Sequence, residues 1–159
     1  MKVQRTLTSW LSRQHDVFRG MLGEMETSLR DDADAARFKT LLVRLLALLS
    51  AHEAVERDLL YPAVLEHVKP LDPRLIDLFQ EGHERIHDKI EALRSALEDK
   101  DAALGRLVAG ADFIALLREH LEEEEQTLFP LADSRVPKAV LTELGARAEG
   151  AATAAGRRP

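Results

Sequence analysis

The feature that most constrains this chain is an internal repeat. The segments HEAVERDLLYP (residues 52–62) and HLEEEEQTLFP (residues 120–130) share a His, then Glu at +4, Leu at +8, an aromatic residue at +9 and Pro at +10. The same offset of 68 residues relates His15 to His83. A repeat of this kind predicts two copies of one structural unit.

Each copy is predicted to be a pair of helices. Apolar residues at helical spacing predict four long helices over residues 8–29, 33–68, 73–98 and 102–129, and a short fifth helix over 137–148. Pro62 is expected to bend or interrupt the second helix. No segment reads as a strand, so the predicted fold class is all-α, an up-down-up-down four-helix bundle with a short C-terminal fifth helix. Residues 1–149 are predicted to form the domain, and residues 150–159 a flexible tail.

Composition excludes several classes of protein. The net charge is -6 and no segment is dominated by Lys and Arg, so we expect no nucleic-acid partner. No segment approaches the roughly 20 apolar residues of a membrane helix, so no membrane association is expected. The chain contains no cysteine, which excludes disulfides and iron–sulfur clusters. The expected location is the cytoplasm.

The histidines point to a metal site inside the bundle. Residues four apart lie on one face of a helix, and this spacing occurs in His52/Glu56, His83/His87 and His120/Glu124. The same faces carry the apolar stripes, so this polarity is expected in the interior, where it is costly without compensation. A lone buried His is usually a hydrogen-bonded core residue, and a lone His/Glu pair usually lies at the surface. Their conjunction in both repeats favours a metal centre, and the predicted metal-binding residues are His15, His52, Glu56, His83, His87, His120 and Glu124.

The residue types narrow the kind of centre. Seven ligands are too many for one ion, whereas two ions that share two bridging carboxylates fit well. Imidazole and carboxylate ligands suit iron, manganese or zinc. A zinc-protease motif begins at His52 but lacks its second His. Glu53, the next residue in the helix after His52, is expected to point about 100° away from the site. The Glu-x-x-His motif of ferritin-like bundles occurs once, at Glu84 and His87, without a second copy.

The pattern His…His-x-x-x-Glu…His-x-x-x-His…His-x-x-x-Glu resembles the hemerythrin family, in its bacterial hemerythrin-like (HHE cation-binding) branch. The LYP and LFP endings of the two repeats are similar to that branch, and the resemblance covers residues 8–148. It implies two non-haem iron ions with a bridging oxo or hydroxo group. By resemblance, one iron takes His83, His87 and His120, the other takes His15 and His52, and Glu56 and Glu124 bridge the two.

Two positions depart from that family or from the repeat. Oxygen-carrying hemerythrins place the last carboxylate as an Asp five residues after its His, whereas this chain has Glu124 four residues after His120. Arg19 stands at the repeat position of His87, which leaves the iron held by His15 and His52 with an open position. We expect a small ligand to bind there. Arg19 itself is expected to be solvated, as is the EEEE run at 122–125 apart from Glu124.

The sequence therefore predicts a protein that binds O2, or a related ligand such as NO or peroxide, for storage, delivery or sensing. One alternative is an enzyme that decomposes hydrogen peroxide or reduces NO. It would need a proton donor such as Tyr61 or Arg19 facing the metals, although Tyr61 is predicted to be a structural plug. Another alternative is an iron- or oxygen-responsive regulator that acts through a protein partner.

Overall fold

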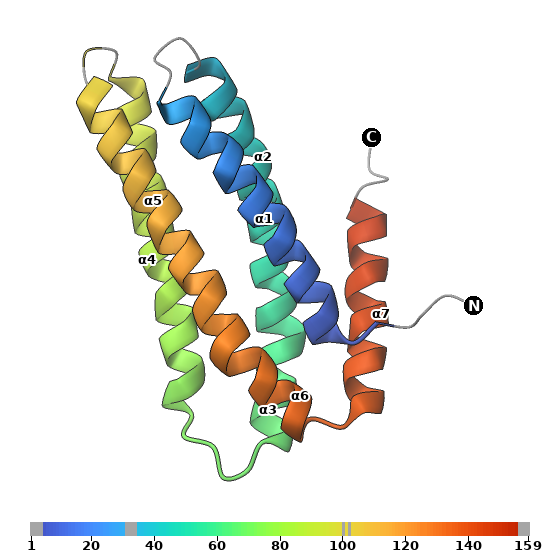
Figure 1. Cartoon of the computed structure of the whole chain (residues 1–159). Coiled ribbons are helices and arrows are strands. Elements are labelled where there is room, and N and C mark those ends of the chain that lie inside the picture. Colours follow the sequence, from blue (N-terminus) through green and yellow to red (C-terminus); the bar gives the residue numbers. More distant parts are fainter. Residues whose placement is uncertain (1–4, 31–34, 100, 102, 156–159) are drawn as a thin grey trace.

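Two helical hairpins pack into a bundle in the computed structural model, which describes residues 5–30, 35–99, 101 and 103–155. The described residues are almost all helical and contain no strand, so the predicted all-α bundle is confirmed. One hairpin packs beside the other through contacts between α1 and α5 (Figure 1). The four long helices are α1 (Leu7–Leu29), α2 (Ala35–Val55), α4 (Arg74–Glu98) and α5 (Ala103–Glu123).

The second helix of each hairpin continues through a π-helical turn. The first π turn, η2 (Glu56–Leu60), leads into α3 (Tyr61–His67), and the second, η3 (Glu124–Leu128), leads into α6 (Phe129–Arg135). Each short helix has its proline in the first turn, where a missing N–H costs little. Pro62, expected to bend or interrupt the second helix, thus lies just beyond a π turn. The π turns coincide with the two glutamates of the repeat, Glu56 and Glu124.

The fifth helix is longer than predicted. Helix α7 spans Lys138–Ala155, so residues 150–155, predicted to belong to a flexible tail, are helical; residues 156–159 lie outside the described part. α7 packs against α1 (Figure 1). A Cβ atom at Gly145 would overlap the backbone carbonyl oxygen of Arg5, so the start of α1 seats closely on α7 because that residue is glycine.

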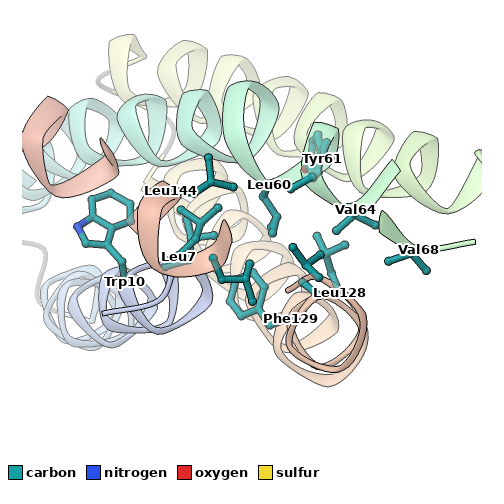
Figure 2. Close-up of a cluster of buried hydrophobic side chains, with 14 of the residues drawn as sticks. Leu7, Trp10, Leu60, Tyr61, Val64, Val68, Leu128, Phe129 and Leu144 are labelled. Atoms are coloured by element: carbon teal, nitrogen blue, oxygen red, sulfur yellow. The ribbon is translucent and has the colours of Figure 1, made fainter. Parts of the chain in front are cut away.

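Two apolar clusters form the core. One joins α1, the π turns, α3, α6 and α7, and it includes Leu7, Leu60 and Leu128 (Figure 2). The other lies between α1, α2, α4 and α5, and it includes Phe18 and Phe113. Within the described residues, no helix is long and apolar enough to cross a membrane.

Candidate metal centre

Six of the seven predicted metal-binding residues lie together inside the bundle. His15 comes from α1, His83 from α4, and the other four come from the two repeat segments. Ligand atoms of His15, His52, Glu56 and Glu124 lie within 4.8 Å of one another, and so do those of His83, His120 and Glu124. Five of these side chains are buried, and the sixth, His83, is mostly buried.

Each carboxylate reaches both hairpins with separate oxygens. Glu56 Oε1 lies 3.3 Å from His52 Nε2, and Glu56 Oε2 lies 3.2 Å from His83 Nε2. Glu124 Oε2 lies 3.3 Å from His15 Nε2, and Glu124 Oε1 lies 3.0 Å from His120 Nε2. The two glutamates therefore stand between a His15/His52 half and a His83/His120 half.

The charges in this centre depend on one another. Burial alone would lower the pKa of His83, but its contacts with Glu124 and Glu56 raise that pKa to about 10. For His52, burial alone would also lower the pKa, but the charge and hydrogen bond of Glu56 have the larger effect, and the pKa of His52 is raised. For Glu124, burial raises the pKa, whereas the neighbouring His120, His15 and His83 bring it well below the ordinary value. Positive charge is thus strongly favoured beside the two carboxylates.

The donor atoms fit a metal. Both oxygens of Glu56 and of Glu124 are buried and lack a hydrogen bond of acceptable geometry, as do His83 Nε2 and His120 Nε2. Buried polar atoms normally have hydrogen-bond partners, and leaving these atoms without partners would cost folding free energy if the cluster were purely structural. Imidazole nitrogens and carboxylate oxygens are suitable ligands for divalent first-row metals. The cluster is therefore suited to binding metal.

The sequence model of the Hemerythrin HHE cation binding domain family matches residues 6–132. The chain belongs to this family. A similar solved structure is that of a hemerythrin HHE cation-binding domain-containing protein, a homologue of Rv2633c, from Mycobacterium kansasii. It has a TM-score of 0.76 and 22% sequence identity, and the match covers 92% of this chain and 84% of that one, which supports the fold. Comparison with curated proteins finds no match.

Among the cluster histidines of the HHE domain, His15 has a carboxylate partner on Nδ1, the ring nitrogen that does not contact the cluster. His15 Nδ1 lies 2.9 Å from Glu125 Oε1. Arg19 donates from both terminal nitrogens to Glu125, at 2.9 and 2.7 Å. The hydrogen bond from Arg19, with that from His15, lowers the pKa of Glu125 against the effect of burial. Arg19 and Glu125, both expected to be solvated, therefore pair with each other. In the sequence, the only sign of this pair is that Arg19 stands at the repeat position of His87.

The structure does not bring His87 into the centre. Its side chain is 57% exposed, and its Nε2 lies 2.9 Å from Glu53 Oε2. The expectation that all three i,i+4 pairs point inward is thus wrong for His87. Its side chain lies on the outward face of α4, where Glu53 of α2 is its acidic partner. Glu53 is not among the residues whose ligand atoms gather in the cluster, and its side chain, only 13% exposed, pairs with His87 instead. The role of His87 as a metal ligand stays a prediction.

Aromatic rings wall the two halves differently. The ring of Phe129 lies 5.1 Å from that of His15, and Phe18 meets His52 edge-on at 5.2 Å. The ring of Tyr61 stacks on His83 at 6.4 Å. Its hydroxyl is buried without a hydrogen-bond partner, and burial with the nearby Glu56 and Glu124 raises its pKa above the ordinary value. One half is therefore walled by phenyl rings and the other by a neutral phenol.

A glycine makes room for one of the imidazoles. A Cβ atom at Gly82 would lie 2.8 Å from His120 Nδ1, closer than side chains normally approach. The repeat places Gln14 at the corresponding position beside His15. The need for a glycine in α4 could not be read from helical periodicity, because it depends on how α5 packs against α4.

Proposed function

We propose that this HHE domain binds two non-haem iron ions and, through them, O2 or a related small ligand such as NO, for storage, delivery or sensing. The observation that carries the proposal is the position of Glu56 and Glu124, each of which presents one oxygen to each histidine pair. Such carboxylates suit two ions held side by side, with an oxo or hydroxo group between them.

The residues divide the work. His15 and His52 would hold one ion, and His83 and His120 the other, with both carboxylates shared. When bound, the iron would supply a redox-active site for a diatomic ligand. The protein excludes bulk water, because His15 and both carboxylates are fully buried. The phenyl rings of Phe18 and Phe129 add an apolar wall to the His15/His52 half, which supports the prediction that the ligand binds there.

Metal content and optical spectra test this proposal. The protein is produced with supplied iron, reduced without oxygen and then exposed to O2. Two irons per chain, with absorption bands that change on O2 exposure and return when O2 is removed, are expected. Fewer than two metals per chain, or manganese or zinc in place of iron under iron-supplied expression, would overturn the di-iron proposal.

Tyr61 supports a second candidate function, a peroxide-decomposing enzyme. A neutral hydroxyl that is buried without a partner can donate a hydrogen bond to a small molecule beside His83. Addition of hydrogen peroxide separates the two candidates. Rapid and repeated evolution of O2 by the wild type, lost in Tyr61→Phe, favours the enzyme. A stable spectrum that Tyr61→Phe leaves unchanged favours the carrier or sensor.

A further inference from the structure

His15 differs from His52 and His120 in the hydrogen bonding of Nδ1, the ring nitrogen that does not contact the cluster. Its Nδ1 lies 2.9 Å from a carboxylate oxygen of Glu125. By contrast, His52 Nδ1 and His120 Nδ1 are buried without a hydrogen-bond partner among the described residues. Nδ1 faces Glu125 and Nε2 faces Glu124, and both carboxylates can only accept a hydrogen bond, but only the contact with Glu125 has hydrogen-bond geometry, so the proton of neutral His15 is assigned to Nδ1. The lone pair is then on Nε2, which lies 3.3 Å from Glu124 Oε2, inside the cluster.

Glu125 is in turn fixed by Arg19. The guanidinium donates to both carboxylate oxygens, a two-bond arrangement that sets orientation as well as position. Arg19 lies one helical turn after His15 on α1, whereas Glu125 belongs to the π turn η3. The three side chains therefore connect the two hairpins without using a ligand atom of the cluster.

The same ion pair separates His15 from solvent. Arg19 and Glu125 line a surface depression of about 390 Å³ together with Phe129 and Asp133. His15, directly behind Glu125, has no exposed surface. Arg19 and Glu125 keep 38% and 30% of their side-chain surface exposed, so the bundle does not depend on them for its core.

We propose that Arg19 and Glu125 are positioning residues that hold His15 with Nε2 directed at the metal cluster before metal binds. This inference rests on the proposed function, because it assigns the pair a role in binding metal. Glu125 fixes the tautomer and ring orientation of His15, and Arg19 fixes Glu125. Partners of this kind change metal affinity by about 10–100-fold when removed.

The first test reads the tautomer of His15 in metal-free protein by ¹⁵N NMR of the imidazole nitrogens. The wild type is expected to carry the proton on Nδ1. Glu125→Ala is expected to give a mixture of tautomers, and Glu125→Gln is expected to restore part of the wild-type signal because its amide oxygen accepts a hydrogen bond. Glu123→Ala, an exposed change in the same acidic run, is the matched control. A wild-type His15 protonated on Nε2, or identical spectra for the Glu125 and Glu123 variants, would overturn the inference.

The second test is an anaerobic titration with Co²⁺, followed by its visible absorption. Glu125→Ala is expected to weaken one of two binding steps by about 10–100-fold, Arg19→Gln by less, and Glu123→Ala not at all. Equal titration curves for the two alanine variants would overturn the inference. If the wild type binds neither Co²⁺ nor iron, the proposed function fails, and the tautomer measurement still decides whether Arg19 and Glu125 position His15.

Discussion

The two halves of the cluster come from equivalent positions of one repeat, yet their surroundings differ. The His15/His52 half has the Arg19–Glu125 pair behind His15 and phenyl rings beside it. The His83/His120 half has Tyr61 stacked on His83 and a glycine against His120. The ligand set is thus nearly symmetric, whereas the residues that support it are not.

The difference shows where a duplicated site acquires distinct properties. The repeat counterparts of Arg19 and Glu125 are His87, in α4, and Arg57, in η2. His87 pairs with Glu53, and Arg57 pairs with its neighbour Asp58 at the surface. Neither of these pairs contacts a cluster histidine. The His15/His52 half therefore has a histidine held by charged side chains from both hairpins, whereas the His83/His120 half has a histidine held by close packing.

The largest effect is expected from Glu124→Ala, which removes the residue shared by both halves. Glu124 contacts His15, His83 and His120, so its loss is expected to reduce bound metal from two ions to none. It also leaves buried His120 without its carboxylate partner, and removing one partner of a buried pair typically costs about 3–5 kcal/mol of folding stability. Metal analysis and urea unfolding of metal-free protein measure the two effects. Two metals retained per chain would contradict the shared role.

A rise in pH is expected to destabilise the metal-free protein through His83. Its pKa is about 10 in the folded state, above the ordinary value of 6.5. The stabilisation is therefore complete below pH 6.5 and is lost as the pH rises through 10. At about 1.4 kcal/mol per pKa unit the full loss is at most on the order of 5 kcal/mol. Urea unfolding across this range is expected to show a steeper loss for wild type than for His83→Gln, and parallel losses would contradict the role of His83.

Gly82→Ala is expected to disturb only the His83/His120 half. The added methyl group pushes against His120, and such overpacking costs about 1–3 kcal/mol. Weaker binding of one Co²⁺ ion and a lower melting temperature are expected. Gly20→Ala is the matched control, because a Cβ there meets nothing within 4 Å and the change favours helix by about 1 kcal/mol. Equal melting temperatures for the two variants would show that the close approach is relieved without cost.

The smallest effect is expected from His87→Ala. Because His87 is exposed and bound to Glu53, its removal is expected to change the melting temperature and the metal content little. Metal analysis of the variant checks this. Loss of one metal ion per chain would instead mean that His87 leaves Glu53 and binds the metal, as the family resemblance implies.

Most of the fold follows from the sequence because apolar periodicity is a local signal. The helix ends at Leu29 and Glu98 are predicted and observed. The π turns were not predicted, since a single turn with i→i+5 bonds shifts the helical phase by only about one residue. The length of α7 was underestimated because its last residues are small and carry little apolar periodicity.

The site residues were likewise predictable where local patterns determine them and not where contacts between helices do. Helical spacing and the repeat placed His52, Glu56, His120 and Glu124 on inward faces. The same spacing wrongly predicted that His87 points inward, because helical spacing cannot account for Glu53, which pairs with His87 from another helix. The bond between His15 and Glu125 joins residues that are far apart in the chain, and no local pattern encodes it.

The contact between Gly145 and the first residues of α1 has a consequence for synthesis. Because α1 precedes α7 in the chain, it is synthesised earlier, so the start of α1 lacks its packing partner until α7 is made. Leu7 and Trp10 stay without the apolar surface of α7 during that time. The end of the bundle nearest His15 can therefore close only after translation of α7, and a truncated chain would emerge with that end open.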